Sequence, residues 1–540
     1  MSNEAYERVR EYHQRTKHSL QKYAKGPEAL DWEAQPDPFR RFEGAQRIAM
    51  PLDSGQIHYA YAELLHGINP KVQALTRQSL GSFFQLSLGL SAWKQYGTDR
   101  WSVRCNPSSG NLHPTEAYAL LPTLDNELVA GVYHYSSYDH CLEQRCRSTE
   151  LAAAVPDDSF FLGLSSIYWR EAWKYGERAY RYCQLDVGHA LAALRIAAAI
   201  HGWQMQLASD YSDEQLASLL GLNRTRDFDN VEKESPDLLL QVSSNKALSN
   251  NTRIDVLLDA LATENSQWSG RANLLDPMPM YQWPVIEEVS HAATRTTTDI
   301  GQHPQYQQVP AEQQALPDLD AVALVKQRRS AQAFDPNHRI DATSFMQILQ
   351  STLATTSPHL FADLPSHIDL LVFVHRVDGL DSGLYMLIRN KAHKTQLQEL
   401  CRKEFDWQRP DDVPESLDLY HLVSANGQKV ARSLACHQAI ASEGIFSVAM
   451  LADFTNNLQS QPWQYRALHW EAGVIGQMLY LAAEAHGLRG TGIGCFFDDA
   501  IHNLLELNDM QYQSLYQFTV GVPIVDARIV NLPPYEHLQN

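Results

Sequence analysis

The sequence lacks the signatures of several protein classes. Its seven cysteines are an odd number and form no CxxC pair, which fits neither a disulfide framework nor a zinc module and indicates a reducing compartment. It contains no GxSxG elbow and no HExxH motif, so a serine hydrolase or a zinc protease is a poor interpretation. His134, His140 and Cys141 form a loose cluster without recognised ligand spacing, and we predict no bound metal.

Basic residues are too few for a nucleic-acid footprint. Lys and Arg total 44 against 63 Asp and Glu, a net charge of −19. Because Lys and Arg drive binding to phosphate backbones, we expect no nucleic-acid partner. The N-terminus shows no apolar secretory segment, and the most apolar helical stretch, 190–200, is far short of the roughly 20 residues that cross a bilayer. We therefore expect a cytoplasmic protein with no membrane partner.

What the sequence does contain is an internal repeat. With 540 residues, 44% of them apolar, the chain suits two or more domains. An ungapped offset of 285 relates 180–202 to 465–487 and 213–223 to 498–508. The matched pairs include Tyr180/Tyr465, Arg181/Arg466, Gly188/Gly473, His201/His486 and Gly202/Gly487, with Asp186 answered by Glu471. This density of matches predicts a fused pseudo-dimer.

The repeat predicts the domain organisation and the fold class. We expect an N-terminal arm (1–50), a first domain (51–265), a Pro-rich connector (266–317) and a second domain (318–540). The connector has little periodicity and is expected to wrap the surface in extended conformation. Apolar residues at helical spacing in 191–198 and 474–481 predict long buried helices, whereas 118–122 and 369–377 are typical of strands. The predicted class is α+β, with helices flanking a mixed β-sheet in each half.

Two polar segments differ between the copies. Copy one has Asn106-Pro107-Ser108-Ser109-Gly110-Asn111-Leu112-His113-Pro114, either a connecting loop or a loop whose amides and hydroxyls face a polar ligand. Copy two has 355–365 there, without the glycine or asparagine. Copy two instead opens with Lys326-Gln327-Arg328-Arg329-Ser330, which is a solvated face or a site for a phosphomonoester. Copy one offers only 75–79, Leu-Thr-Arg-Gln-Ser.

Two further segments separate the copies. One is the glycine-rich run Gly490-Thr491-Gly492-Ile493-Gly494, which matches a dinucleotide-binding fingerprint only weakly. Its alternating glycines either let the backbone approach a flat ligand closely or relieve crowding at the edge of a β-sheet. Copy one has no glycines at the matching positions. Residues 173–182 carry adjacent Lys174 and Tyr175, which are either part of a packed surface turn or a proton-transfer pair at a cleft.

Together these segments resemble the nitroreductase-like flavoprotein superfamily, specifically its SagB-type (azoline oxidase-like) dehydrogenase branch in a tandem, fused form. The motifs are YHQRTKHS (12–19), PDPFRRF (36–42), PSSGNLHPTEAY (107–118), KYGERAYRY (174–182), LDVGH (185–189), RRSAQAF (328–334) and GLRGTGIGCFFDD (487–499). The resemblance implies two nitroreductase-like domains, each a helix-flanked mixed sheet, with FMN bound at the interface between them.

The resemblance also implies one composite FMN site made from both copies. Copy two would supply Arg328, Arg329, Ser330, Gly492, Ile493, Gly494 and Arg528, and copy one would supply Pro107, Ser108, Ser109 and Asn111. Lys174 and Tyr175 match the pair that supports substrate deprotonation in the azoline-oxidising branch, while hydride passes to flavin N5. Gln332 stands where the family usually has an arginine, so the resemblance leaves one contact to the phosphate or the ribityl chain unassigned. The mirror position lacks these motifs, which predicts one FMN per chain.

The expected activity is that of an FMN-dependent oxidoreductase acting on a small organic or peptide-derived substrate. An NAD(P)H-dependent nitro or quinone reductase is the nearest alternative, and a non-catalytic flavin-binding scaffold is the other. The sequence leaves open the substrate, the electron donor or acceptor and any further pairing of the pseudo-dimer.

Overall fold

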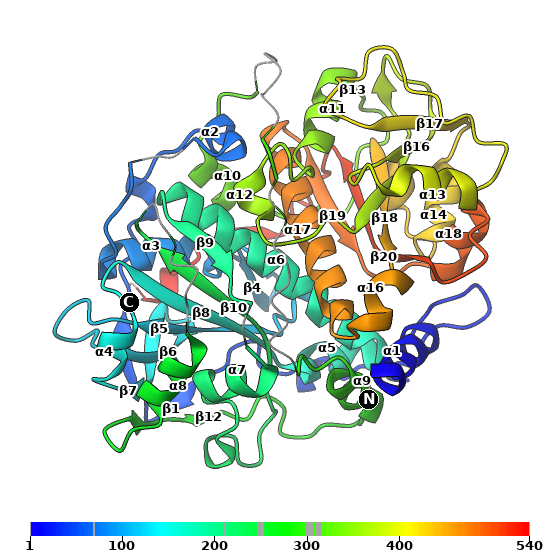
Figure 1. Ribbon diagram of the computed structural model, residues 1–540. Helices are drawn as coiled ribbons and strands as arrows, with labels where there is room; N and C mark the ends of the chain where they lie inside the picture. Colours follow the sequence, from blue (N-terminus) through cyan, green and yellow to red (C-terminus); the bar gives the residue numbers. More distant parts are fainter. Residues whose placement is uncertain are drawn as a thin grey trace.

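Two β-sheets with the same strand order form the framework of the protein (Figure 1). The computed structural model describes residues 2–68, 71–209, 211–245, 248, 253–296, 304, 306–308 and 316–538. The first sheet has the order β11-β7-β6-β5-β8-β10-β9 and the second β17-β16-β14-β18-β20-β19. In the first sheet the strands are β5 (Thr115–Leu121), β6 (Gly131–Ser136), β7 (Cys141–Arg147), β8 (Ser159–Ser166), β9 (Gln204–Leu207), β10 (Ser235–Ser243) and β11 (Gln267–Trp268). In the second they are β14 (Ile368–Val374), β16 (Gly383–Leu387), β17 (Leu419–Ser424), β18 (Phe446–Asp453), β19 (Arg489–Ile493) and β20 (Tyr512–Gly521).

Both sheets are antiparallel, so the prediction of mixed sheets was wrong. Neighbouring strands pair antiparallel throughout the two described sheets, for example β5 with β8 and β14 with β18. A helical connection leads from β8 to β9, and these two strands run in the same direction. However, β10 lies between those two strands and pairs antiparallel with each. The strands predicted at 118–122 and 369–377 correspond to β5 and β14.

Two central helices of 22 residues each, α6 (Ala179–Ile200) and α17 (Gln464–Ala485), pack against each other between the sheets (Figure 1). They confirm the predicted long buried helices and span equivalent parts of the repeat. They cross at Gly188 and Gly473, where a Cβ on either glycine would lie 2.9 and 2.7 Å from the other's Cα. The helix backbones can approach this closely only because neither residue has a side chain.

The contacts around this crossing are reciprocal. Arg181 of α6 binds Asp498 at 2.7 Å, and Arg466 of α17 binds Asp213 at 2.9 Å. The offset of 285 relates the two arginines to each other and the two aspartates to each other. Such an exchange of equivalent contacts is the pattern of a two-fold interface between identical subunits.

Further helices cover the outer face of each sheet (Figure 1). On the first sheet these are α4 (Leu151–Ala154), α7 (Asp213–Leu220) and α8 (Ile254–Leu261). On the second they are α13 (His393–Leu400), α14 (Gln428–Leu434) and α18 (Asp498–Leu505). One continuous apolar core extends from the inner face of the first sheet through α6 and α17 to the second.

The N-terminal arm and the connector are parts of the fold. Helix α1 (Ser2–Arg15) packs on α9 (Pro284–Ala292), and β2 (Gln46–Ala49) joins β7. Strand β1 (Phe42–Glu43) pairs with β12 (Arg271–Ala272). The expectation of an extended connector was wrong for 284–292, because these residues form helix α9, whose apolar residues Ile286 and Val289 are buried. Connector residues 297–303, 305 and 309–315 lie outside the described part.

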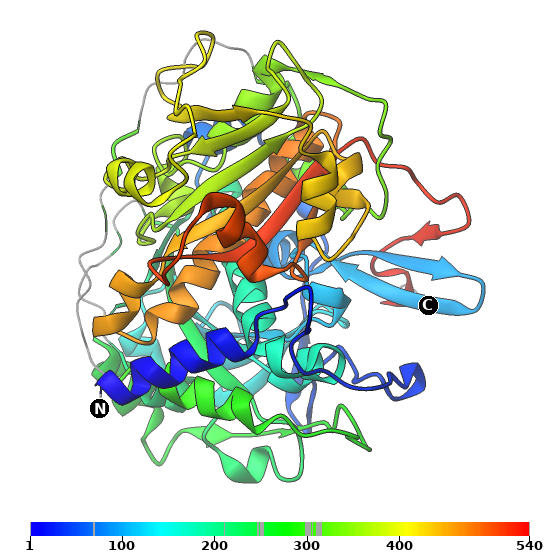
Figure 2. The same cartoon turned by 90° about the vertical axis from the view of Figure 1, so that its right-hand side faces the viewer.

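A hairpin of β3 (Leu90–Tyr96) and β4 (Asp99–Arg104) protrudes from the molecule, with the C-terminal segment alongside it (Figure 2). Strand β21 (Val530–Leu532), at the end of the second copy, pairs with β3 of the first. A strand of the second copy thus forms backbone hydrogen bonds with a strand of the first at this edge.

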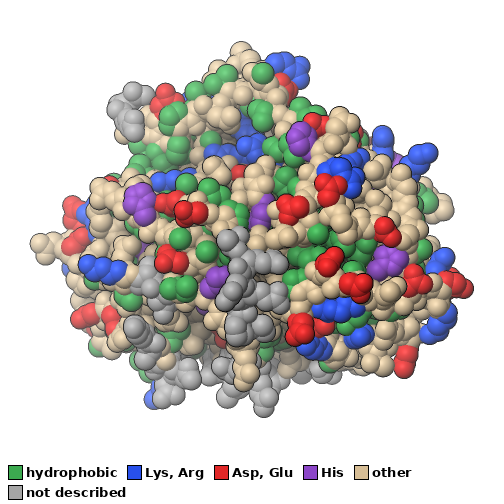
Figure 3. Space-filling model, turned by 90° about the horizontal axis from the view of Figure 1, so that it is seen from above, with side chains coloured by type: hydrophobic (Ala, Val, Ile, Leu, Met, Phe, Trp, Pro, Cys, Tyr) green, Lys and Arg blue, Asp and Glu red, His purple; other side chains and the backbone are tan. Residues whose placement is uncertain are grey.

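One helical segment, Tyr168–Ile200, is long and apolar enough to cross a membrane by length and composition, but 94% of its most apolar window is buried inside the protein. That burial is typical of a core helix. On the face seen from above, acidic and basic side chains are interspersed (Figure 3).

Candidate functional site

A cavity of about 360 Å³ lies between the two copies and collects most of the predicted site residues. This volume is within the range of about 300–1,000 Å³ usual for small-molecule sites. The predicted residues that line it are Pro107, Ser108, Ser109, Asn111, Tyr175, Arg328, Arg329, Ser330, Gly492, Ile493 and Gly494. Segments far apart in the sequence therefore meet at one cavity wall.

The polar loop of copy one is held in an unusual backbone conformation. Its turn η3 (Ser109–Asn111) includes Gly110 with φ +58° and Asn111 with φ +62°, and His113 has φ +53°. The Asn111 side chain donates to Ser102 O at 2.9 Å, and the Ser109 amide and hydroxyl both donate to the Asp186 carboxylate of α6. The loop is therefore fixed by its own copy before any ligand binds.

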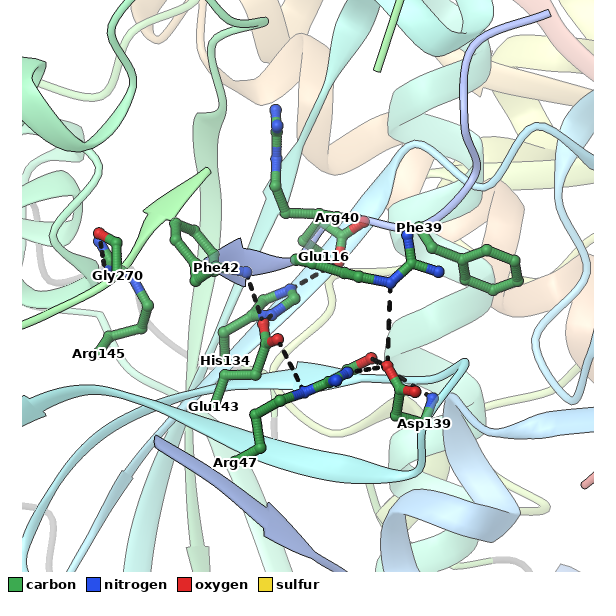
Figure 4. Close-up of polar contacts among 12 residues, drawn as sticks. Phe39, Arg40, Phe42, Arg47, Glu116, His134, Asp139, Glu143, Arg145 and Gly270 are labelled. Atoms are coloured by element: carbon green, nitrogen blue, oxygen red, sulfur yellow. Dashed lines mark hydrogen bonds and ion pairs between the residues drawn. The ribbon is translucent and has the colours of Figure 1, made fainter. Parts of the chain in front are cut away.

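A buried ionic network supports this loop. Arg170 donates to His113 O at 2.7 Å and pairs with Glu116. His134 lies between Glu116 and Glu143, at 2.8 and 2.9 Å (Figure 4). Burial lowers the pKa of His134, but the two carboxylates outweigh that effect and raise it to about 9. His134 is therefore a charged partner of two carboxylates and not a metal ligand.

Of the arginine pair of copy two, Arg328 is buried and Arg329 is half-buried. The nearby Glu484 carboxylate accepts from the Arg329 backbone amide at 3.1 Å and forms its ion pair with Arg489. Arg328 and Arg329 follow α10 (Ala321–Gln327), and their guanidinium groups donate to backbone oxygens, among them Cys105 O at 3.2 Å and Ser91 O at 2.8 Å. Neither forms an ion pair within the described residues, and Nη1 of Arg328 has no hydrogen-bond partner there. Burial, together with the charge of Arg328, lowers the pKa of Arg329 to about 10. An anion would relieve this accumulation of positive charge.

Gly490 and Gly492 of copy two lie on the edge strand β19, Gly494 follows that strand directly, and Gly492 and Gly494 pack against tyrosines. A Cβ on Gly492 would lie 1.7 Å from the Tyr516 hydroxyl oxygen, and one on Gly494 would lie 2.2 Å from the Tyr182 ring. The Gly492 amide donates to the Tyr480 hydroxyl at 3.0 Å, and that hydroxyl contacts Ser330 at 2.8 Å. Glycine is required here because these tyrosines approach the strand closely.

Of the predicted pair Lys174 and Tyr175, only Tyr175 lines the cavity. Tyr175 lines the cavity, with its hydroxyl against Gly110, whereas Lys174 lies behind it, its Nζ 5.2 Å from the Trp32 ring centroid. Burial lowers the pKa of Lys174 and raises that of Tyr175 well above its usual range. Tyr175 therefore carries its proton at neutral pH and is a hydrogen-bond donor.

Two buried carboxyl groups beside the cavity were not predicted as site residues. Asp186 lines the cavity, and burial raises its pKa to about 7 despite its hydrogen bonds from Ser108 and Ser109. Burial and the charge of Asp186 raise the pKa of Glu171 well above its usual range. The sequence signal for Asp186 was a single acidic residue just before the apolar stretch of α6. Burying a carboxyl group costs free energy, so an acid in such a place indicates a role in the site.

We expect Asp186→Asn to flatten the pH dependence of stability between about pH 4 and pH 7. The pKa of Asp186 is about 7 in the folded chain against an ordinary value of 3.8, so the folded state holds a proton that the unfolded chain releases in this window. The free energy of unfolding from this group therefore falls as pH rises, by at most about 1.4 kcal/mol per pH unit. Denaturant titrations across the window measure the slope, with the exposed Glu264→Gln as control. Equal slopes for the Asp186→Asn variant and the unaltered chain would contradict the assignment.

Arg528 does not reach the cavity. It is exposed, pairs with Asp526 at 2.7 Å and lies 5.4 Å from the Tyr96 ring centroid on the protruding hairpin. The prediction that it lies in the site was therefore wrong, because an acid two residues earlier holds the side chain outside.

The mirror position holds only a small cavity of about 90 Å³. It is lined by Leu207, Ala208 and Ser209, which the offset relates to the glycine strand of copy two. Two tryptophans, Trp463 and Trp470, fill the space, and Arg295 packs 4.8 Å from the Trp463 ring centroid. Packing has thus replaced the larger cavity on this side.

The carboxylate at the mirror position also has a different role. Glu471, the counterpart of Asp186, pairs with Arg389 and accepts from the His367 amide at 2.9 Å. It is neutralised inside copy two and has no equivalent of the serine loop. The two copies therefore differ in charge as well as in volume at equivalent places.

The comparisons with known proteins agree with this architecture. Residues 325–522 match the sequence model of the nitroreductase family. The structure of a protein described as a nitroreductase from Anabaena variabilis has a TM-score of 0.68 at 21% identity, covering 96% of this chain and 99% of that one. The nitroreductase-like fold thus extends over nearly the whole chain, including the first copy, which the family model does not match.

Other similarities are partial. The Escherichia coli microcin synthetase McbBCD complex has a TM-score of 0.29 at 14% identity, covering 41% of this chain and 79% of that one. The NADPH:FMN oxidoreductase from Vibrio harveyi has a TM-score of 0.22 at 15% identity, covering 38% and 68%. A comparison with curated protein sequences gives no match.

Proposed function

We propose that the chain is an FMN-dependent oxidoreductase of the SagB-type nitroreductase-like branch, with two domains that share one flavin site. The observation that carries the proposal is the composite cavity, where the serine loop of copy one faces the unpaired arginines of copy two. The shared strand order and the reciprocal Arg181–Asp498 and Arg466–Asp213 pairs support the division into domains at 51–265 and 318–540.

The donors around the cavity suit FMN. Arg328 and Arg329 suit a phosphate because two adjacent guanidinium groups line the cavity and Nη1 of the buried Arg328 has no hydrogen-bond partner within the described residues. Ser108, Ser109 and Ser330 offer hydroxyls of the kind that a ribityl chain requires. Gly492 presents only backbone to the cavity. When bound, FMN supplies a ring that accepts a hydride at N5.

The residues of the chain itself would act on the substrate. Tyr175 carries a proton at the cavity wall, so it can donate a hydrogen bond to an electronegative substrate atom. Lys174, whose pKa is lowered by burial, lies behind Tyr175 with its Nζ 5.4 Å from the centroid of that ring. Asp186, with a pKa near 7, can exchange a proton close to neutral pH. These groups support proton removal from a substrate that loses a hydride.

The experiment that tests the proposal is a visible spectrum of the purified full chain with mass-spectrometric identification of the released cofactor. We expect a flavin band and FMN. Anaerobic mixing with an azoline-containing peptide should bleach the band and remove two hydrogens from the peptide; bleaching by NADPH instead would identify a nicotinamide-dependent reductase. A colourless chain that does not take up added FMN would refute the proposal.

Tyr175→Phe is expected to lower turnover by about a hundredfold to a thousandfold, while FMN remains bound. The hydroxyl faces the cavity, but the ring packs on Tyr182 at 4.5 Å between centroids, so phenylalanine preserves the wall. Lys174→Met should lower turnover less, because Lys174 does not line the cavity. Flavin content and single-turnover reduction rates separate the two effects, with Tyr96→Phe on the exposed hairpin as control. Loss of FMN from Tyr175→Phe would make this residue structural.

A further inference from the structure

Two cysteines from distant segments meet at the wall of the cavity. Cys495 follows β19 and lines the cavity, whereas Cys436 lies in the turn between α14 and α15 (Ile440–Glu443). The segments are joined by the Phe497 amide donating to Leu434 O at 2.8 Å and by the Gln438 side chain donating to Cys495 O at 3.0 Å. The two thiols lie close enough for each to shift the pKa of the other.

These two thiols differ from the other five in exposure. Cys436 and Cys495 are partly exposed, whereas Cys105, Cys141, Cys146, Cys183 and Cys401 are buried. Burial raises the pKa of all five buried thiols, to about 12 for Cys141, Cys146 and Cys401. The buried thiols are therefore protonated and inaccessible, and they serve as internal references.

The surroundings of Cys495 favour its thiolate. The hydrogen bond from Cys436 lowers the pKa of Cys495 to about 5; burial opposes this, and a hydrogen bond from His18 and the charge of Arg178 assist it. The same thiol pair and burial raise the pKa of Cys436. His437 follows Cys436 directly, and Arg432 donates to the backbone oxygen of His437 at 3.3 Å. The phenols Tyr23, Tyr175 and Tyr182 also lie near the pair.

The backbone holds Cys436 in place. Cys436 and His437 have φ of +50° and +63°, two consecutive left-handed residues that are not glycine. The His437 ring packs edge-on to Phe497, with 5.4 Å between centroids, two residues after Cys495. This packing keeps the turn beside the end of β19.

We propose that Cys495 and Cys436 are a redox-active pair, in which Cys495 is the nucleophile and Cys436 resolves, and that the oxidant is a low-molecular-weight disulfide. The Cys495 thiolate attacks one sulfur of the disulfide, forming a mixed disulfide and releasing one thiolate. Cys436 then attacks Cys495 sulfur, forming the intramolecular disulfide and releasing the second thiolate, which takes the proton of Cys436. The protein loses two electrons and the small disulfide gains two. The new bond ties the 435–439 turn to the end of the glycine strand.

The test is the reaction of the reduced full chain with oxidised glutathione, followed by peptide mass spectrometry. We expect loss of two hydrogens and a Cys436–Cys495 cross-linked peptide. Cys436→Ser should stop at a glutathione adduct on Cys495, Cys495→Ser should give no adduct at either position, and Cys401→Ser should behave as the unaltered chain. An adduct that persists on Cys495 without cross-linking, modification first at Cys436, or no reaction of the folded chain would each overturn the proposal.

A second measurement separates a reactive thiolate from an ordinary exposed thiol. The rate at which iodoacetamide alkylates Cys495 should change by less than about threefold between about pH 6 and pH 8. The rate for a thiol of ordinary pKa near 8.5 changes by about 75-fold over the same range. Cys436→Ala removes the thiol that lowers the pKa of Cys495, so the alkylation rate of Cys495 in this variant should rise more steeply with pH. An ordinary steep profile in the unaltered chain would overturn the assignment of Cys495 as nucleophile.

Discussion

Arg329→Met is expected to weaken FMN binding by about tenfold to a hundredfold, because each charge-assisted hydrogen bond to a phosphate contributes about 1.5–3 kcal/mol. Riboflavin has no phosphate, so its affinity should be unchanged. Methionine keeps an unbranched apolar stem and removes the charge and the guanidinium donors, including those to Ser91 O and Lys326 O. Fluorescence titration of the flavin-free chain with both flavins measures the difference directly.

The control is Arg77→Met, in the segment 75–79 that was compared with the arginine pair on sequence alone. Arg77 donates to Ala49 O at 2.7 Å and pairs with Glu127, so its charge is neutralised locally. FMN affinity should be unchanged in this variant. The same titration gives the stoichiometry, expected at one FMN per chain because the mirror cavity is about 90 Å³. Two equivalents per chain, or equal losses of FMN and riboflavin affinity in Arg329→Met, would refute the single composite site.

Gly188→Ala and Gly473→Ala are each expected to lower the free energy of unfolding by about 3 kcal/mol or to prevent folding. A Cβ on Gly188 would lie 2.3 Å from Trp470 O, and one on Gly473 would lie 2.3 Å from Leu185 O. Both neighbours are backbone atoms of a packed helix, so neither can move without separating α6 from α17. Alanine in a helix is otherwise favoured over glycine by about 1 kcal/mol, so a net loss isolates the clash.

Denaturant titration of both single variants and the double variant tests this contact. Once one alanine has separated the helices, the second meets less resistance, so the double variant should lose less than the sum of the single losses. Gly26→Ala is the control, because no atom lies within 4 Å of its added Cβ. Additive losses would show that the two glycines do not meet, and an unchanged stability would show that the helices are not in close contact.

Local sequence patterns predicted many features correctly. The apolar periodicity around 191–198 and 474–481 predicted α6 and α17, and 118–122 and 369–377 predicted β5 and β14. These segments have apolar residues either at helical spacing or in short continuous runs, and both patterns depend only on near neighbours. The prediction of mixed sheets failed because strand direction depends on which strands become neighbours. Sequence periodicity does not contain that information.

The candidate site was predicted unevenly for a related reason. Glycine, serine and arginine motifs stand out in sequence, so Ser108, Arg329 and Gly492 were predicted as site residues and all three line the cavity. Arg528 was included by resemblance, but a local partner, Asp526, keeps it outside. Asp186 was not predicted, since its raised pKa comes from burial, which is a property of the packed structure.

The sequence by itself determined that the chain is a repeat with unequal halves, because the offset of 285 and the motifs present in one copy only are read directly from residue order. Only the tertiary structure decided that the unequal parts face one another. The close crossing at Gly188 and Gly473 brings the serine loop, the arginine pair and the glycine strand to a single cavity. It also decided that Trp463 and Trp470 fill the equivalent space and that Cys436 meets Cys495. The physical reason is that such meetings depend on how two helices pack, whereas residue order fixes only what each helix carries.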